Sequence, residues 1–149
     1  MTLATYGHQR IFGAVRMGKV ELSEIGRFVG EEWIRSEKIR KEVRLDEFVV
    51  MPDHLHGIKW WTPVGPPVAA HCNAQLPVYE TPSLFRSPRS LGSFISGFKG
   101  TVTRRANSHW ETAGLPVWQR NYYDRVVRNR RELKAFRWYI RTNPSRWDE

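Results

Sequence analysis

The chain has 149 residues, 40% of them hydrophobic, which suits a single domain with a proper core. Its 24 lysines and arginines against 15 acidic residues give a formal net charge of +9 and a pI near 10.2. No stretch approaches the ~20 apolar residues of a membrane span, and no secretory signal is evident at the start. Cys72 is the only cysteine, which excludes an internal disulfide and favours a reducing, cytoplasmic setting. The basic surplus favours a polyanionic partner, most often nucleic acid, although solubility alone would also account for it.

The first half of the chain predicts short extended pieces, a helix and a pair of strands. The extended pieces are residues 2–5 and 10–16. Apolar residues at three- and four-residue spacing predict a helix over 23–39. Two strands are expected at 43–51 and 54–61, because apolar runs flank a turn that contains a proline.

The second half opens with a change of composition. Residues 62–89 hold six of the nine prolines and predict a long, mobile surface loop. Ser90 then begins a helix that continues past residue 102, and residues 117–127 predict a further strand. A last helix is expected over 130–143, since the next residue is a proline. The order of elements implies an α+β fold, with helices packed on an antiparallel sheet in one domain of 149 residues.

Two histidines stand at the start of the second paired strand. Residues two apart in a strand point to the same side of the sheet, so His54 and His56 would present two imidazoles side by side. Leu55 would face the opposite way, into the core. Neutral imidazole binds most divalent metal ions, which makes the two histidines candidate metal ligands. A pair at this spacing is only moderately specific, and two ligands do not complete a site.

The last helix carries the remaining candidates. Tyr139 and Asn143 are four residues apart and therefore share one helix face. Asn143 offers an amide oxygen suited to Mg²⁺ or Mn²⁺, and the phenol of Tyr139 is a possible nucleophile beside a metal-bound phosphate. The alternatives are a tyrosine at the edge of the core and an asparagine that ends the helix. Spacing alone leaves both open.

Four segments form a pattern that spans nearly the whole chain. They read VVMPDHLHGI at 49–58, LGSFISGFKG at 91–100, VWQRNYYD at 117–124 and WYIRTNP at 138–144. In order and spacing they resemble the single-tyrosine HUH transposases, in particular the branch of REP-associated tyrosine transposases. The loop at 62–89 is the divergent part.

The resemblance implies a ferredoxin-like fold in which His54 and His56 hold a divalent metal ion, Mg²⁺ or Mn²⁺. It places Asn143 as a third polar ligand and Tyr139 as the catalytic nucleophile, which forms a 5′-phosphotyrosine bond to single-stranded DNA. The implied function is metal-dependent DNA cleavage and strand transfer on hairpins or palindromic repeats. Monomers and homodimers both occur in the family, so the oligomeric state stays open, and no membrane partner is expected.

Basic side chains are expected to hold the DNA backbone. The candidates are Lys99, Arg104, Arg105, Arg120, Arg125, Arg128 and Arg131. One of the aromatic groups of Trp118, Tyr122 and Tyr123 is expected to be free to stack on bases.

The family has an extended segment before its first central strand, whereas Met1 falls almost at the end of that strand. This difference is expected to weaken hairpin recognition. It leaves an alternative function open: an inactive or domesticated DNA- or RNA-binding module on the same fold.

Overall fold

The computed structural model describes residues 1–62 and 90–147, so the predicted proline-rich loop lies outside the described residues from residue 63 to residue 89. The described helices and strands, in chain order, are β1 (Thr2–Ala4), β2 (Gly13–Arg16), β3 (Lys19–Leu22), α1 (Glu24–Ile39), β4 (Val43–Val50), β5 (His54–Trp61), α2 (Leu91–His109) and α3 (Arg130–Thr142). Short 3₁₀ turns stand at Tyr6–His8 and Pro144–Arg146. None of the helices within the described ranges is long and apolar enough to cross a membrane.

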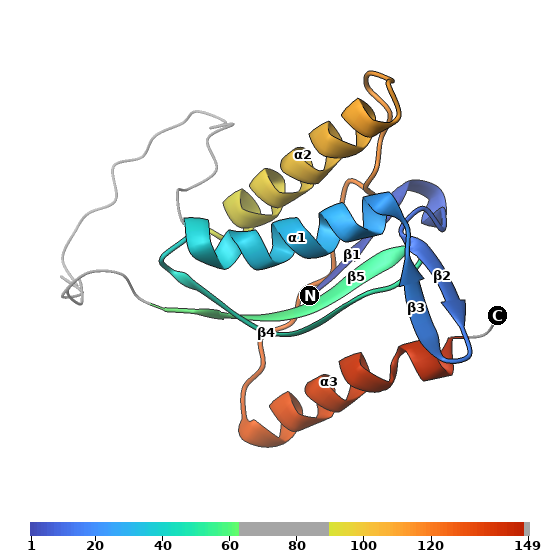
Figure 1. The fold of residues 1–149 in the computed structure, drawn as a ribbon. Helices are drawn as coiled ribbons and strands as arrows, with labels where there is room; N and C mark the ends of the chain where they lie inside the picture. Colours follow the sequence, from blue (N-terminus) through green and yellow to red (C-terminus); the bar gives the residue numbers. More distant parts are fainter. Residues whose placement is uncertain (63–89, 148–149) are drawn as a thin grey trace, which may run out of the picture.

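An antiparallel sheet is the centre of the fold. Its strand order is β1-β5-β4, and residues 117–123 run alongside the free edge of β1 through two isolated bridges, Thr2 to Tyr123 and Thr5 to Trp118. Helices α1 and α2 cover one face of the sheet, and α3 lies on the opposite face (Figure 1). This arrangement confirms the predicted ferredoxin-like α+β fold, in which helices pack on an antiparallel sheet.

The strand predicted over 117–127 is wrong. The register against β1 changes between the two bridges, so the segment bulges instead of continuing as a strand. The ammonium of Lys99 donates to the backbone carbonyls of Gln119 and Asn121, at 2.6 and 3.0 Å. It thereby satisfies carbonyl groups of the bulged segment.

A small hairpin that the sequence pattern did not predict precedes α1. Strands β2 and β3 pair from Gly13 opposite Leu22 to Arg16 opposite Lys19. The two residues between them, Met17 and Gly18, have φ of 51° and 71°. Positive φ at both positions is the turn that matches the twist of a two-residue hairpin.

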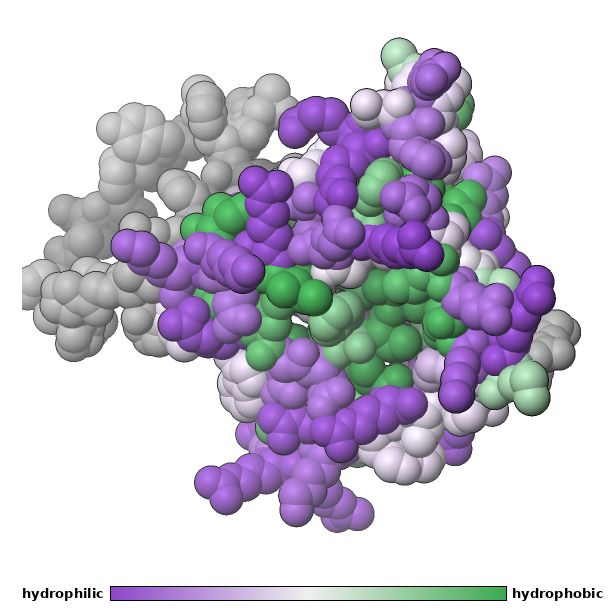
Figure 2. Space-filling view, viewed as in Figure 1, coloured by the Kyte–Doolittle hydropathy of each residue, from purple (hydrophilic) through white to green (hydrophobic). Residues whose placement is uncertain are grey.

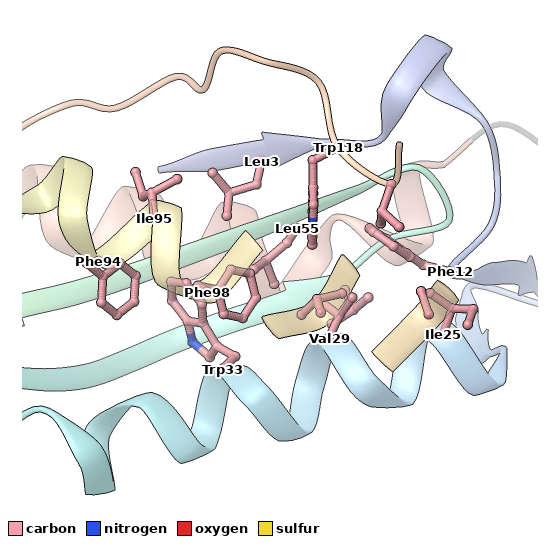
Figure 3. Packing of buried hydrophobic residues seen from close by; sticks show 14 of the residues in the cluster. Leu3, Phe12, Ile25, Val29, Trp33, Leu55, Phe94, Ile95, Phe98 and Trp118 are labelled. Atoms are coloured by element: carbon pink, nitrogen blue, oxygen red, sulfur yellow. The ribbon is translucent and has the colours of Figure 1, made fainter. Parts of the chain in front are cut away.

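The main core lies between the sheet and the two helices α1 and α2 (Figure 3). Trp33 on α1 is fully buried and stands edge-on to Phe94 and Phe98 of α2. Its ring lies over Gly57 of β5, where an added Cβ would come within 2.4 Å of the tryptophan Cζ2. Only glycine fits at this close approach, so Trp33 fixes the height of α1 above the strand that carries both histidines.

Each helix begins at a polar cap. The Ser23 side chain accepts from the amide of Gly26, and Ser90 accepts from that of Ser93. Asn129 caps α3 by accepting from the amide of Glu132. These local bonds explain why the predicted helix starts were confirmed within a residue.

Helix α3 packs on the sheet through a small second cluster. Ile58, Leu133 and Ile140 are its buried members. On the face shown in Figure 2, hydrophilic side chains cover much of α3, and apolar side chains gather between α1 and α3. A helix with so narrow an apolar stripe needs further contacts to hold it in place.

Two ion pairs supply those contacts. The register of β4 against β5 shifts between Leu45 and Phe48, so Asp46 and Glu47 form a bulge opposite β5. Asp46 pairs with Arg137 and Glu47 with Arg141, one helical turn apart on α3. The bulge therefore fixes the part of α3 that contains Tyr139.

Candidate active site

The two histidines of β5 lie side by side, as predicted. The ring centroids of His54 and His56 are 4.4 Å apart, and Leu55 between them is fully buried in the main core. The alternation of a strand accounts for this arrangement. The imidazoles are therefore on the same face of the sheet as α3.

His54 is held by its neighbour in the chain. Its Nδ1 lies 2.5 Å from a carboxylate oxygen of Asp53, which accepts the Nδ1 hydrogen. The other ring nitrogen, Nε2, is then an acceptor. It is buried and has no hydrogen-bond partner within the described ranges. An unpaired buried lone pair on an oriented imidazole is the arrangement that a metal ligand needs.

His56 is oriented by the first strand. Its Nδ1 lies 2.7 Å from the hydroxyl of Thr2, which pairs with it across the β1–β5 ladder. Burial lowers the pKa of His56 to about 3, with the nearby His54 and the N-terminal ammonium as smaller causes of the same shift. The imidazole is therefore neutral near pH 7, which is the form that binds metal ions.

Tyr139 on α3 reaches the histidine pair. Its hydroxyl lies 3.5 Å from Nε2 of His56, at the outer limit of a hydrogen bond, and the two ring centroids are 5.3 Å apart. The tyrosine is 43% exposed, so it is open to a bound molecule rather than enclosed in the core. Residues 83 positions apart thus meet at one point.

Asn143 caps the C-terminal end of α3, one turn beyond Tyr139, and is buried. Its backbone carbonyl accepts from the amide of Arg146. No group of three or more His, Cys, Asp or Glu that could hold a metal ion occurs in residues 1–62 and 90–147. A metal ion on the two histidines would therefore draw its other ligands from amide, water or substrate oxygens.

A groove of about 560 Å³ includes His56 and Tyr139 in its lining. Trp60 and Trp61, further along β5, line it as well. Residues 123–127 also line the groove, and much of the lining is apolar. Such a groove suits flat, apolar groups with polar edges.

The aromatic side chains on the bulged segment differ in exposure. Trp118 is buried at 8% exposed and packs on Phe12, whereas Tyr122 and Tyr123 are 37% and 67% exposed. The sequence predicted one free aromatic group of the three, and the structure leaves two exposed because this segment does not alternate as a strand would. Tyr123 lines the groove.

The predicted DNA-binding residues fall into separate places. A hollow of about 490 Å³ beside α2 is lined by Lys99, Arg104 and Arg120. Arg105 faces α1, where it pairs with Glu31 and Glu32. These two carboxylates engage its guanidinium, so Arg105 joins α1 to α2.

The remaining three predicted residues lie near the start of α3. Arg125 lines the groove and pairs with Glu132 at 3.1 Å. Arg128 and Arg131 are exposed. Arg125 alone of the three lines the groove that includes Tyr139, and the binding of DNA by these arginines stays a prediction.

No family model matches the chain. The chain is 32% identical over 151 aligned positions to a protein of Haemophilus influenzae described as uncharacterized, and the match covers 100% of this chain and 81% of the relative. The chain therefore belongs to the same family as that protein.

The fold occurs in a solved structure of another protein. It is described as the REP-associated tyrosine transposase bound to a REP hairpin, and it superposes with a TM-score of 0.61 over 97% of this chain. The sequence identity is 15%, and this chain spans 64% of the length of that structure's chain. Similarity at this level of identity shows that the two proteins have the same fold.

Proposed function

We propose that this chain is a DNA transposase of the single-tyrosine HUH type, which cuts and rejoins single-stranded DNA. The observation that carries the proposal is the contact between the Tyr139 hydroxyl and Nε2 of His56 at 3.5 Å. The fold shared with a tyrosine transposase supports it. So do the four sequence segments in which the histidines and the tyrosine stand.

Two observations on the histidines support a site for a divalent metal ion. Nε2 of His54 is buried without a partner among the described residues, and His56 is neutral because burial lowers its pKa. The Nδ1 atoms of the two histidines are held by Asp53 and Thr2, so the two rings are preorganised. His54, His56 and Asn143 would hold Mg²⁺ or Mn²⁺. Such an ion would stabilise the negative charge that develops on the phosphate during the reaction.

Tyr139 would supply the nucleophile. Its phenolic oxygen loses a proton to solvent and forms a bond to the phosphorus of the DNA backbone. The bond from phosphorus to the 3′ oxygen breaks, and that oxygen leaves with the electron pair and takes up a proton as a 3′-hydroxyl. The 5′ side of the break stays attached to the tyrosine. Because the phosphodiester bond is exchanged for another, the strand can be rejoined.

The groove beside Tyr139 suits the unpaired part of the substrate. Tyr123 and Trp60 expose aromatic surface along it, and aromatic groups stack on bases without strong sequence preference. Arg125 adds positive charge to the same groove. A hairpin substrate is supported by the REP hairpin bound to the solved structure of the same fold.

The test is the formation of a covalent complex. The protein is incubated with labelled hairpin oligonucleotides from the DNA that flanks its own gene, with Mg²⁺ or Mn²⁺, and resolved on a denaturing gel. We expect a stable adduct from the parent protein and none from Tyr139→Phe, which should still bind the hairpin. Tyr122→Phe is the matched control and should form the adduct. An adduct that persists in Tyr139→Phe contradicts the role of this tyrosine.

A binding module without chemistry is the second candidate. It is favoured by the lack of a third His, Cys, Asp or Glu ligand beside the histidines in the described part of the chain. Such a module would bind the hairpin with a steep dependence on salt, because phosphate contacts release counterions. It would give no adduct in the parent protein under any of the metal conditions.

A further inference from the structure

A row of ring contacts runs from Tyr139 through the two histidines and continues beyond His54. Trp147, which follows the turn after α3, has its ring centroid 5.6 Å from that of His54. The guanidinium carbon of Arg10 lies 5.7 Å from the centroid of the same tryptophan. Each group in this row neighbours the next, in the order Tyr139, His56, His54, Trp147 and Arg10.

A hollow of about 200 Å³ lies at the far end of this row. It is lined by Arg10, Ala14, Val15, Arg16, Pro52 and Trp147. Two of these six residues are arginines, and none is acidic. Arg16 also pairs with Glu21 on the facing strand at 3.4 Å, but both side chains are largely exposed and such a pair is weak. The hollow therefore has a positive lining next to His54.

Trp147 holds Arg10 in position. A guanidinium over a tryptophan ring gains a cation–π attraction and loses some of its rotational freedom. Pro52 and Val15 also line the hollow, and both are buried, so this part of the lining is held in place by packing. A planar, preorganised guanidinium recognises a phosphate better than a flexible ammonium does.

We infer that this hollow binds a phosphodiester group of the DNA, at the end of the row of ring contacts that begins at Tyr139. The inference rests on the proposed function, because a phosphate between Tyr139 and the histidines requires the strand to continue past them. On one side the strand enters the groove lined by Tyr123 and Trp60. On the other side it reaches Arg10 and Arg16, which neutralise its charge.

The experiment measures coupling between Arg10 and single phosphates. The Tyr139→Phe protein is used, so that binding stays reversible, with a labelled hairpin from the DNA that flanks the gene and single-stranded extensions on both sides. Each linkage of the extensions is replaced in turn by a neutral methylphosphonate. We expect one linkage whose neutralisation weakens binding about tenfold, the effect of one charge-assisted contact. In the Arg10→Ala protein the same replacement should have no further effect.

Arg35→Ala is the matched control, because Arg35 is an exposed arginine of α1 and its removal lowers the net charge equally. It should leave the linkage effect in place. The inference is wrong if Arg10→Ala weakens binding by the same factor at every linkage, or not at all. It is also wrong if inorganic phosphate occupies the hollow, seen by NMR at the Arg10 side chain, while no linkage couples to Arg10.

The outcome is independent of the covalent step. A linkage coupled to Arg10 would support the hollow even if the parent protein formed no adduct. An adduct without such a linkage would support the proposed function alone.

Discussion

The carboxylate of Asp46 receives two hydrogen bonds from the guanidinium of Arg137, at 2.8 and 2.7 Å. Asp46 stands in the bulge of β4, and its side chain is only 7% exposed. Arg137 is two residues before Tyr139 on α3, so this pair and its neighbour, Glu47 with Arg141, lie on both sides of the proposed nucleophile in the chain. The placement of the tyrosine over His56 thus depends on ion pairs to β4 that join residues 91 and 94 positions apart.

The two partners of this pair should not be equivalent in mutation. Arg137→Met leaves the buried carboxylate of Asp46 without its charged partner, whereas Asp46→Ala leaves an arginine that can turn into solvent. We expect the midpoint of urea denaturation to fall more for Arg137→Met than for Asp46→Ala. Arg131→Met, at an exposed position of the same helix, should leave the midpoint unchanged. Equal losses for the two variants of the pair would contradict this account of the bulge.

The Asp46 pair should also be sensitive to acid. The hydrogen bonds from Arg137 hold the pKa of Asp46 below its ordinary value of 3.8. Its stabilising contribution is therefore complete above pH 3.8 and is lost as the pH falls through the lower pKa of the folded state. We expect the difference in unfolding free energy between the parent and Asp46→Asn to shrink below pH 3.8, as measured by urea denaturation at a series of pH values. A difference that stays constant down to the acid limit of folding would count against the pair.

Gly57→Ala tests the close contact between β5 and Trp33, which fixes the distance of α1 from the sheet. The added Cβ would lie 2.4 Å from Trp33, and both groups are in the main core. We expect a loss of about 1–3 kcal/mol in the free energy of unfolding, the range for overpacked cores. The indole fluorescence should also change, because Trp33 must move.

Gly100→Ala is the control for Gly57→Ala. An added Cβ at Gly100 meets nothing within 4 Å, and the position is exposed on helix α2. The alanine should stabilise the protein by about 1 kcal/mol through helix propensity. A similar destabilisation at both glycines would mean that the space beside Trp33 is not limiting.

Local patterns in the sequence predicted much of this fold. The histidine strand and the three long helices follow from apolar periodicity and capping residues, which are properties of neighbouring positions. The strand predicted over 117–127 failed, because the bulge held by Lys99 is set by contact with β1 and α2. The β2–β3 hairpin was missed because its turn residues, Met17 and Gly18, are not a typical pair for that turn.

The candidate site also combines features that local sequence predicts with features that only tertiary contacts set. The pairing of His54 with His56 follows from strand geometry alone. The approach of Tyr139 is a tertiary contact, and no spacing within α3 could have established it. The contacts of Thr2 with His56 and of Trp147 with His54 are likewise long-range, so the sequence carried no signal for them. Asp53 could be proposed as an orienting group because it is adjacent to His54, and the structure places its carboxylate on that ring.

Lys59 carries a buried ammonium to which the described part of the chain makes no hydrogen bond. The ammonium lies over the rings of Trp61 and Phe94. Burial, with the charge of Arg40 as a second cause, lowers the pKa of Lys59 from 10.5 to about 8. At pH 7 both the folded and the unfolded chain carry the charge, so the whole cost of burying it is present. We expect Lys59→Met to raise the free energy of unfolding at pH 7 by about 1 kcal/mol. This figure is reduced to allow for solvent screening, because the residue as a whole is only partly buried.

The pH dependence separates this effect from better packing of methionine. Between pH 8 and 10.5 the unfolded parent still binds the proton that the folded parent has lost, so the parent should gain stability as the pH rises through this window. The Lys59→Met protein should lack that gain. Parallel curves for the two proteins across the window would contradict the assignment of the lowered pKa to Lys59.

Removal of the group that orients His54 should weaken metal binding more than it weakens folding. The Asp53 carboxylate lies 2.5 Å from Nδ1 of His54, and loss of such an orienting partner costs about 10–100-fold in metal affinity. We expect Asp53→Ala to bind Mn²⁺ that much more weakly than the parent in a titration followed by electron paramagnetic resonance. Glu24→Ala removes an exposed carboxylate of equal charge and should bind Mn²⁺ as the parent does. If Asp53→Ala retains the parent affinity while His54→Ala loses it, the carboxylate does not prepare the ring for the ion. If His54→Ala also retains it, the two histidines are not the ligands, and the fixed imidazoles of β5 serve packing alone.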